Sequence, residues 1–401
     1  MSAIALERLL IVHDYSGLGG GAEQAVHHLR DILRARGIDA RLLASTADAA
    51  AAGSEPDHVY AGGTGKLRSL REVINPSAVL SLRRVLREFD PQGVYLGMFL
   101  TQASPAILPQ LSGRAVIWVP NEFRPVCPKG TRLLPDRTPC DEPVGRACLR
   151  HGCFRPWGLA PRLAQISLMR RWLHVIDRVL APSRAFGERL RRHGIRVDGV
   201  LHHAVPPGIA RRERHDAPVV AFAGRLVPEK GADIAIRAFA RIVAPFPTAR
   251  LWIAGAGPER AGLETLGKEL GIDSRVDFLG HLSRPELEAR LARAWVQCVP
   301  TLWEEPFGLV AAEAQARGTV VVASAVGALP ELIADGKTGY LLPPGDPGAL
   351  ATALQQVLAD PGAADRLGDA ARVTTMKRFG VDAYADRLLT EFEEIQSDGR
   401  S

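Results

Sequence analysis

The second half of the chain alternates short apolar runs with segments in which apolar residues recur every three or four positions. Short Val-rich runs such as residues 320–324 are typical of strands buried on both faces of a parallel sheet, and the longer spacing is typical of helices that cover such a sheet. The predicted strands are residues 219–223, 250–255, 275–279, 296–302 and 320–324, and the predicted helices are residues 230–246, 259–270, 285–294 and 309–317. Residues 329–334, 339–342 and 348–358 complete the series. This order predicts a doubly wound α/β domain.

The first half repeats the alternation less regularly. Its predicted strands are residues 9–13, 40–44, 93–96, 115–119 and 178–181, and its predicted helices are residues 22–36, 77–89, 162–173 and 184–193. A stretch rich in Pro and charge, residues 205–218, is typical of a linker between the halves. The sequence therefore predicts an α/β chain of two Rossmann-like domains, residues 1–207 and 208–382, with parallel sheets facing a central cleft. Ligands of such sheets bind at the carboxyl ends of the strands, so the loops there are expected to carry the chemistry.

Length and composition agree with two ordinary domains. The chain has 401 residues, of which 46% are hydrophobic and 23% charged, which excludes wholesale disorder. No stretch approaches the roughly 18 uncharged apolar residues of a membrane helix. The opening segment carries Glu7 and Arg8 inside its apolar run, so it predicts a first strand rather than a secretion signal. We expect a cytoplasmic protein.

Charge is distributed unevenly along the chain. Residues 1–200 contain 28 Lys and Arg against 18 Asp and Glu, whereas residues 201–401 contain 22 against 26. A basic first half suits an anionic lipid, an acidic acceptor or a phosphorylated ligand, and a solvated basic surface is the alternative. Peripheral contact with the inner membrane face therefore stays open, although Arg170 and Arg171 point about 100° apart on their predicted helix and form no basic stripe. No nucleic-acid partner is expected.

Two carboxylates flank a strand-to-helix junction in the second half. The segment Glu305-Pro306-Phe307-Gly308-Leu309-Val310 follows a predicted strand and enters a predicted helix, and Glu313 lies about two turns later. The first amides of a helix and its dipole favour a phosphate, and nearby carboxylates suit the hydroxyl groups of a ligand built around a diphosphate. The alternative is an ordinary helix with an acidic first turn.

Two further loops lie between a strand and a helix. Gly224-Arg225 and Lys230 place two cations five residues apart, which suits charge-assisted hydrogen bonds to a diphosphate, although ordinary surface charge is the alternative. Gly19-Gly20-Gly21 would let the backbone approach a ligand closely, and the alternative is an ordinary turn without a ligand. It is not the G-x-G-x-x-G fingerprint of dinucleotide binding, which disfavours a Rossmann oxidoreductase.

Together these segments resemble the family 4 retaining glycosyltransferases of GT-B fold. The resemblance covers most of the chain and is strongest over residues 218–345. It rests on the following segments: Gly224-Arg225 to Lys230-Gly231, Gly255-Ala-Gly257-Pro258-Glu259, Val276-Asp-Phe278-Leu-Gly280, Pro300 to Glu313, Val326-Gly327-Ala328 and Asp335-Gly336. It also implies that a helix at residues 383–401 packs back on the first domain, which carries an insert at about residues 120–161.

The resemblance implies a role for each matched residue. Arg225 and Lys230 hold the donor diphosphate, Glu305 contacts the donor sugar, and Glu313 takes the ribose hydroxyls. The other donor-binding positions implied are Gly20, Gly21, Gly224, Gly257, Val276, Phe278, Pro306, Phe307, Gly308, Leu309 and Val310. The implied reaction moves a sugar from a UDP- or GDP-linked donor with retention at the anomeric carbon. The two cations would replace a catalytic metal, in agreement with the lack of an Asp-x-Asp motif.

The acceptor side is less specified. His13 and Asp14 end the first strand, and Asn121 stands where relatives often have a sugar-contacting histidine, with Arg124 nearby. We expect these four residues to contact the acceptor or the sugar. The acceptor itself, whether a sugar, a small molecule or a lipid-linked nucleophile, stays open.

Four cysteines crowd into the insert. Cys127, Cys140, Cys148 and Cys153 lie within 27 residues, whereas Cys298 is alone in a predicted strand. A structural zinc ion or iron–sulfur cluster, separate reduced thiols and redox bridging all stay open, because the spacing lacks the C-x-x-C pair of common zinc sites.

Three other functions are alternatives to sugar transfer: a nucleotide-sugar epimerase, a phosphorylase and a nucleotide-sugar-binding subunit. A nucleotide-sugar epimerase or a phosphorylase would share the architecture, but the matched cations and carboxylates favour the transferase. A binding subunit without turnover would be favoured by loss of Glu305 or Lys230, and both are present.

Overall fold

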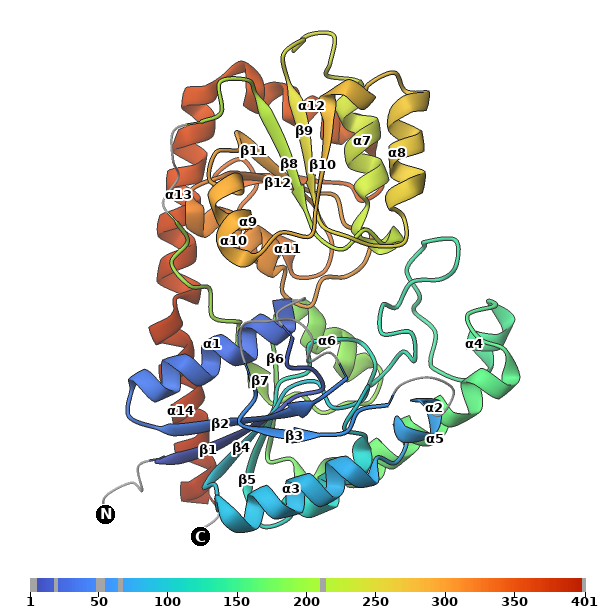
Figure 1. Cartoon of the computed structure of the whole chain (residues 1–401), viewed down its shortest axis with the longest axis vertical. Coiled ribbons are helices and arrows are strands. Elements are labelled where there is room, and N and C mark those ends of the chain that lie inside the picture. The colour runs from blue at the N-terminus through green and yellow to red at the C-terminus, as the bar shows by residue number, and fades with distance from the viewer. Residues whose placement is uncertain (1–5, 18–20, 48–54, 64–67, 210–213, 399–401) are drawn as a thin grey trace. The chain divides into compact units, whose positions relative to one another are not determined.

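The chain divides into two compact units, drawn in Figure 1. The computed structural model describes residues 6–17, 21–47, 55–63, 68–209 and 214–398. Unit 1 comprises Met1–Pro135, Cys140–Ala204 and Val381–Ser401, and unit 2 comprises Asp136–Pro139 and Val205–Gly380. The predicted domain bounds at residues 207 and 382, the insert and the returning helix at 383–401 stay predictions.

Unit 1 is built on a seven-stranded parallel sheet. The strand order is β3-β2-β1-β4-β5-β6-β7, so the chain moves outward from β1 in both directions. The strands are β1 (Arg8–Val12), β2 (Asp39–Ser45), β3 (His58–Tyr60), β4 (Gly93–Leu96), β5 (Ala115–Trp118), β6 (Arg178–Ala181) and β7 (Gly199–Val200). The order reverses between β1 and β4, which is where ligands of doubly wound sheets bind.

Helices cover both faces of this sheet. One face shares an apolar core with α1 (Gly21–Ala35) and α14 (Val381–Asp398). Figure 1 shows α3 (Pro76–Glu88) and α5 (Pro156–Trp172) on the opposite side of the sheet from α1. The shorter helices are α2 (Arg68–Arg71), α4 (Arg146–Arg150) and α6 (Arg184–Arg192), with 3₁₀ helices at Pro105–Leu111 and Leu173–Val175.

Unit 2 is built on a six-stranded parallel sheet. The order is β10-β9-β8-β11-β12-β13, and it reverses between β8 and β11. The strands are β8 (Val219–Ala223), β9 (Arg250–Ala254), β10 (Val276–Gly280), β11 (Val296–Val299), β12 (Val320–Ser324) and β13 (Gly339–Leu342). Alternate residues of the central strands enter different cores: Val220 and Phe222 face one layer of helices, and Val219 and Ala221 face the other.

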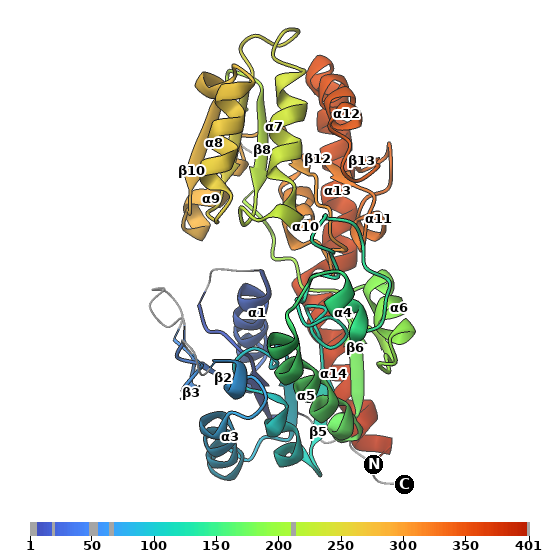
Figure 2. The same cartoon turned by 90° about the vertical axis from the view of Figure 1, so that its right-hand side faces the viewer.

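Two layers of helices complete unit 2. The first core is shared with α7 (Ala232–Ala240), α8 (Arg260–Glu269) and α12 (Pro347–Ala359), and Figure 2 shows α7 and α8 side by side along the sheet. The opposite face packs against α9 (Arg284–Leu291), α10 (Leu309–Arg317), α11 (Leu329–Leu332) and the end of α13 (Pro361–Phe379).

These two parallel sheets with helices on their faces confirm the predicted fold class. Several element bounds differ from the prediction, most clearly those of α5 and α7. Helix α5 begins at Pro156 and continues through Pro161, at the cost of one backbone hydrogen bond. Helix α7 ends at Ala240, because the next residues tighten: the amide of Arg241 donates to Ala238 and that of Ile242 donates to Phe239. The long helix α13 was not predicted. None of the helices in the described ranges is both long and apolar enough to cross a membrane.

Candidate functional site

The loops that follow β8 and β11 meet at the reversal point of the unit 2 sheet. Arg225 and Lys230 lie in the loop after β8, and Glu305 lies in the loop between β11 and α10. The two strands are hydrogen-bonded neighbours and run parallel, so both loops leave the same edge. These two loops, both at carboxyl ends of strands where the sequence analysis expects the chemistry, therefore lie together in unit 2.

Lys230 and Glu305 form an ion pair at this edge. The Lys230 Nζ atom lies 2.5 Å from Glu305 Oε1, and it also lies 5.0 Å from the centre of the Trp303 ring. The side chains of Lys230 and Glu305 are 19% and 8% exposed. A pair this sheltered from water is only weakly screened, so a ligand phosphate or hydroxyl would meet a strong local field.

Arg225 is more accessible than Lys230. Its side chain is 64% exposed, and its Nη2 atom lies 4.0 Å from Glu229. At 4.0 Å the Glu229 carboxylate is too far for a hydrogen bond, so it leaves N–H donors of this exposed guanidinium available for an anionic ligand.

Glycine holds the Lys230 loop against the end of β11. Gly231 has φ +69°, and a Cβ there would lie 2.1 Å from the Pro300 carbonyl oxygen. The amide of Leu302 donates to the Glu229 carbonyl at 2.9 Å, and the Thr301 hydroxyl donates to the same oxygen at 3.0 Å. The two loops therefore hold each other by backbone contacts, which fixes the separation of Lys230 and Glu305.

A second glycine packs directly against the backbone of Glu305. Gly327 has φ +59°, and a Cβ there would lie 2.5 Å from the Glu305 amide nitrogen and 2.7 Å from the Glu305 carbonyl oxygen. The amide of Ala328 donates to that oxygen at 3.0 Å. The loop after β12 thus supports Glu305 from below, and any side chain at position 327 would displace it.

The remaining predicted donor residues of unit 2 line the same strand ends. Gly224 donates its amide to Ala254, and Gly257 packs so closely on Leu226 that a Cβ would lie 2.2 Å from the Leu226 carbonyl oxygen. Pro306 and Phe307 are buried, and Gly308, with φ +93°, precedes Leu309 and Val310 in the first turn of α10. First-turn amides lack acceptors within their own helix and point outward from its end.

Glu313 is half-buried on α10 and is already engaged by an arginine. Its Oε1 atom accepts from Arg284 Nη1 at 2.7 Å. Burial raises the pKa of the Glu313 carboxyl, and the nearby Arg284 opposes that rise. Arg284 also contacts Glu288 at 3.2 Å, and Glu288 in turn pairs with the buried Arg317 at 2.8 Å. The structure therefore adds a partner for Glu313 that a ribose would have to share or displace.

Val276 and Phe278, expected beside a base, lie on β10. Val276 is buried, and the Phe278 ring lies 5.8 Å from the Arg260 guanidinium carbon. Asp277, between them, forms a two-point ion pair with Arg250 at 2.5 and 2.7 Å. The pairing with Arg250 holds the pKa of Asp277 below its ordinary value.

In unit 1, Asp14 organises the loop that follows β4. Its carboxylate accepts three backbone amide hydrogens, from Thr101, Gln102 and Ala103, at 2.6 to 2.8 Å. Burial raises the pKa of Asp14, and the three hydrogen bonds act in the opposite direction.

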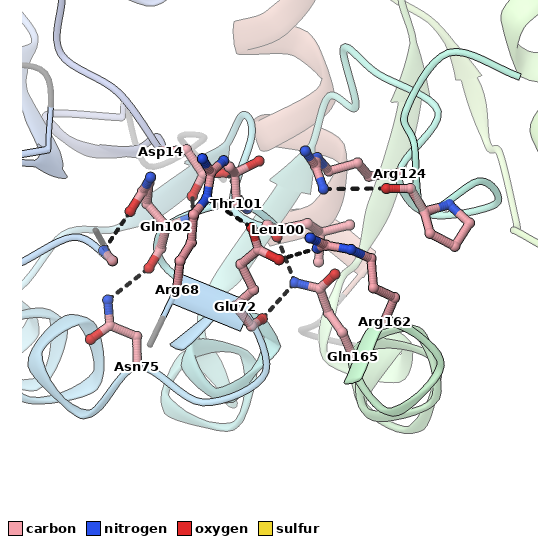
Figure 3. A network of polar contacts seen from close by, with 12 residues as sticks. Asp14, Arg68, Glu72, Asn75, Leu100, Thr101, Gln102, Arg124, Arg162 and Gln165 are labelled. Carbon is pink, nitrogen blue, oxygen red and sulfur yellow. Dashed lines mark hydrogen bonds and ion pairs between the residues drawn. The ribbon is translucent and has the colours of Figure 1, made fainter. Parts of the chain in front are cut away.

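Other side chains hold the same loop from beneath, as Figure 3 shows. Asn75 donates to the Gln102 carbonyl at 2.7 Å, and Gln165 donates to the Leu100 carbonyl at 2.5 Å. Arg68 and Arg162 both pair with Glu72, which is 2% exposed. This network and the amide hydrogen bonds to Asp14 together fix the backbone after β4. The Asp14 oxygens are thus engaged by amides of the chain itself rather than by a ligand.

Several polar atoms near the carboxyl ends of β1, β4 and β5 have no hydrogen-bond partner in the described chain. They are His13 Nε2, Thr101 Oγ1 and both side-chain polar atoms of Asn121. His13 is fully buried, and its Nδ1 atom lies 3.0 Å from the Tyr15 carbonyl. Buried polar groups without partners are costly, and a polar ligand would satisfy them. Sequence reasoning selected His13 and Asn121 but missed Thr101, which no motif marks.

Beside Asn121, Arg124 pairs with an acid. Its Nε atom lies 3.2 Å from Glu122 Oε2, and its Nη1 atom donates to the Pro128 carbonyl at 3.4 Å. Burial raises the pKa of Glu122 to about 7, and Arg124 opposes the rise. Of the predicted glycine loop, Gly21 begins α1, and Gly20 lies outside the described residues.

The four insert cysteines carry free thiols and are half-buried. Burial raises the pKa of Cys148 and of Cys153 above the ordinary thiol value. In the described part of the chain, no three His, Cys, Asp or Glu side chains are placed to hold a metal ion as they stand. Cys298 is buried in β11, and burial raises the pKa of its thiol to about 12.

Comparison with known proteins assigns both units to one enzyme family. Residues 210–374 match the family of glycosyl transferases group 1, and residues 20–208 match the glycosyl transferase 4-like domain. Among curated relatives, the chain is 40% identical over 188 residues to a D-inositol 3-phosphate glycosyltransferase of Kribbella flavida, a match that covers 45% of this chain and 44% of the relative. It is 41% identical over 166 residues to a glycogen synthase of Mycobacterium tuberculosis, covering 41% of this chain and 40% of the relative. These matches span less than half the length of the relatives.

Solved structures share the fold over almost the whole chain. A sucrose-phosphate synthase from Thermosynechococcus elongatus superposes with a TM-score of 0.75 and 22% identity, covering 98% of this chain and all of that one. The Anabaena protein HepE in complex with UDP and glucose superposes with a TM-score of 0.69 and 19% identity, covering 97% and 100%. The chain therefore belongs to the group 1 glycosyltransferases of GT-B fold, with a glycosyl transferase 4-like domain ahead of the group 1 domain.

Proposed function

We propose that the protein is a retaining glycosyltransferase that moves a sugar from a UDP- or GDP-linked donor without a catalytic metal. The observation that carries the proposal is the Lys230–Glu305 pair, 2.5 Å apart, with the accessible Arg225 on the same loop as Lys230. A cation and a carboxylate fixed side by side match a ligand that joins a diphosphate to a sugar. The solved HepE structure with UDP and glucose supports a donor of this class.

Each polar group of this edge would have a distinct task. Arg225 and Lys230 would bind the diphosphate and stabilise the charge that develops on it as the glycosidic bond breaks. The first-turn amides of Leu309 and Val310 would add hydrogen-bond donors. Glu305 would accept hydrogen bonds from the sugar, and Glu313 from the ribose. Because two cations supply the charge, we expect no divalent metal to be needed.

Unit 1 would bind the acceptor. The unpartnered atoms of His13 and Asn121 and the half-buried Arg124 support contacts to a hydroxylated molecule. One relative is named for D-inositol 3-phosphate and another for glycogen, so the acceptor class stays wide: a sugar, a small molecule or a lipid-linked nucleophile. If the acceptor is lipid-linked, the proposal includes a cytoplasmic protein that contacts the inner face of the membrane peripherally.

A thermal-shift series tests the donor site. The purified chain and its Lys230→Ala variant are heated with UDP, GDP, ADP and their common sugar conjugates at millimolar concentration. A ligand at 100 times its Kd stabilises the native state by about 2.7 kcal/mol, so the right nucleotide raises the melting temperature of the natural chain. Lys230→Ala should lose this response, and Lys268→Ala, at an exposed position on α8, should keep it.

Removal of Lys230 leaves the buried Glu305 carboxylate unpaired, so Lys230→Ala can lower stability by itself. The double variant Lys230→Ala/Glu305→Gln removes that charge and should still fail to respond to nucleotide. No stabilisation of the natural chain by any nucleotide would refute the donor site. Binding without transfer to any acceptor would instead indicate a binding subunit. If transfer occurs, NMR of the product shows whether the anomeric configuration is retained, and activity in EDTA tests the metal independence.

A further inference from the structure

Four cysteines of the insert border one small cavity in unit 1. Cys127, Cys140, Cys148 and Cys153 all line one pocket of about 20 Å³. That volume is close to what one water molecule needs. Four half-buried thiols around a space of this size, from positions up to 26 residues apart in the chain, form a cluster that the donor and acceptor chemistry does not use. We propose that these four cysteines bind one zinc ion as thiolates and that the ion holds the insert in its fold.

Backbone hydrogen bonds fix where each cysteine lies. Cys127 begins a turn, since its carbonyl accepts from Gly130 at 2.8 Å. Cys140 is tied to Arg132, whose carbonyl accepts from the Cys140 amide at 2.8 Å and whose guanidinium donates to the Cys140 carbonyl. Cys148 lies in α4, and its carbonyl accepts from Phe154 at 3.2 Å, next to Cys153. A turn, a pair of contacts between residues 132 and 140, and helix α4 with the residues that follow it thus bring the thiols to the same cavity.

The insert needs a cross-link, because it has little regular structure. No helix or strand lies between β5 and α4, a described stretch of residues 119–145. Loops of this length inside a compact unit are uncommon, because ordering their backbone is costly and few ladder hydrogen bonds offset it. Its buried hydrophobic residues are Val119, Phe123, Val126 and Leu133, and between Leu133 and Ala147, all of it described, none is buried. A structural metal is a common means of holding such a segment.

Charge around the cavity favours a tetrathiolate. Zinc with four thiolates carries a formal charge of −2, which an apolar cavity alone would not tolerate. Arg132, 2% exposed, and Lys129 line the same cavity and would compensate that charge. His151 also lines it, and its Nε2 atom lies 2.6 Å from Glu142 Oε1, which leaves Nδ1 as its ring atom for a metal. The four sulfurs complete a tetrahedral set without it.

Four thiolates suit either a single zinc ion or an iron–sulfur cluster, and the metal content measured below distinguishes the two. As the side chains stand, no three of them are placed to hold an ion within the described residues. Binding therefore requires the four thiols to rotate toward a common centre. The step releases the four thiol protons to solvent as four Zn–S bonds form, with no change in oxidation state.

Metal content and optical spectra test the proposal on the full chain, purified without chelator. We expect elemental mass spectrometry to find about one zinc ion per chain. Each single Cys→Ser change at positions 127, 140, 148 and 153 should lower zinc affinity at least tenfold, because it removes one of four ligands. Cys298→Ser, at a buried cysteine in unit 2, is the matched control and should retain full zinc. Replacement of zinc by Co²⁺ should give the visible bands of a tetrahedral cobalt thiolate.

Three results would overturn the proposal. They are metal-free protein with four reactive thiols, protein that contains iron and sulfide, and protein whose mass shows two disulfides in place of thiols. Because a Cys→Ser variant can fail to fold, the natural chain is also treated with a strong chelator. Its melting temperature should fall and should recover when zinc alone is added back; an unchanged melting temperature after complete removal of zinc would refute the structural role.

Discussion

The Glu122 carboxyl lies where burial disfavours its ionised form. Its side chain is 20% exposed, and burial raises its pKa from 4.5 to about 7. The unfolded chain would release this proton near the ordinary value, so the folded state binds more protons between about pH 4.5 and 7. Stability from this group is complete below pH 4.5 and is lost as the pH rises through 7.

Glu122→Gln should remove this pH dependence. Gln keeps an oxygen that can accept from Arg124 but has no charge to bury. We expect the free energy of unfolding of the natural chain to fall by about 1–3 kcal/mol relative to the variant between pH 5 and pH 8. Denaturant unfolding at pH 5, 6.5 and 8 measures the difference. Glu188→Gln, at an exposed glutamate of α6, is the control, and parallel pH profiles for the natural chain and Glu122→Gln would contradict the assignment.

At the scale of elements, the loop after β12 decides where Glu305 lies. Gly327 and Gly336 have nearly the same left-handed backbone, with φ +59° and +68°. A Cβ at position 327 would collide with the Glu305 backbone, whereas a Cβ at position 336 would have nothing within 4 Å. The two glycines therefore separate backbone strain from displacement of Glu305.

Gly327→Ala should impair the donor site, and Gly336→Ala should not. Both variants should lose about 1 kcal/mol of stability because alanine is strained in this conformation, and Gly327→Ala should lose more because its Cβ collides with the Glu305 backbone. Gly327→Ala should in addition weaken nucleotide-sugar binding about tenfold or more, because Glu305 shifts. Calorimetric titration with the donor found in the thermal-shift series measures the donor affinity of both variants, and denaturant unfolding measures their stability. Equal donor affinity in the two variants would mean that the contact with Glu305 does not position it.

Sequence periodicity predicted the elements that carry strong apolar patterns and missed the ones that pack by other means. The bounds of β12 and α10 matched, because Val-rich and Ala-rich runs with clear ends specify them. Helix α13 was missed, because it packs through small residues: Ala364, Gly368 and Ala371 are buried, and a Cβ at Gly368 would lie 2.1 Å from the Gly318 carbonyl oxygen. Close backbone packing leaves no hydrophobic period to detect.

For the candidate site, sequence reasoning could place residues on loops but could not pair them. Parallel strands made it possible to expect Lys230 and Glu305 at one sheet edge. Their ion pair, and the Arg284 partner of Glu313, join residues 75 and 29 positions apart, which local patterns do not encode. The support that Gly327 gives to Glu305 depends likewise on a tertiary contact between two loops.

At the scale of the whole molecule, each unit has its own apolar cores. The core of unit 1 includes Phe392 and Leu388 of α14, both fully buried, although this helix follows unit 2 in the chain. The Tyr384 hydroxyl lies 3.2 Å from the Tyr95 hydroxyl of β4. The cores of unit 2 contain no residue of α14. The last helix therefore contributes to the stability of unit 1.

Phe392→Ala should destabilise unit 1 alone. Removal of a fully buried phenylalanine costs about 3–5 kcal/mol, which lowers the melting temperature of a unit of this size by about 10 °C. In a calorimetric scan, the nucleotide that binds unit 2 should raise a second transition that Phe392→Ala leaves in place. Phe239→Ala, at a fully buried residue of α7, should lower that nucleotide-responsive transition instead, and Glu393→Ala, at an exposed position of α14, should change neither. If both phenylalanine variants and the nucleotide shift one common transition, the two cores unfold as a single cooperative unit and the assignment of α14 to a separately stable unit 1 is wrong.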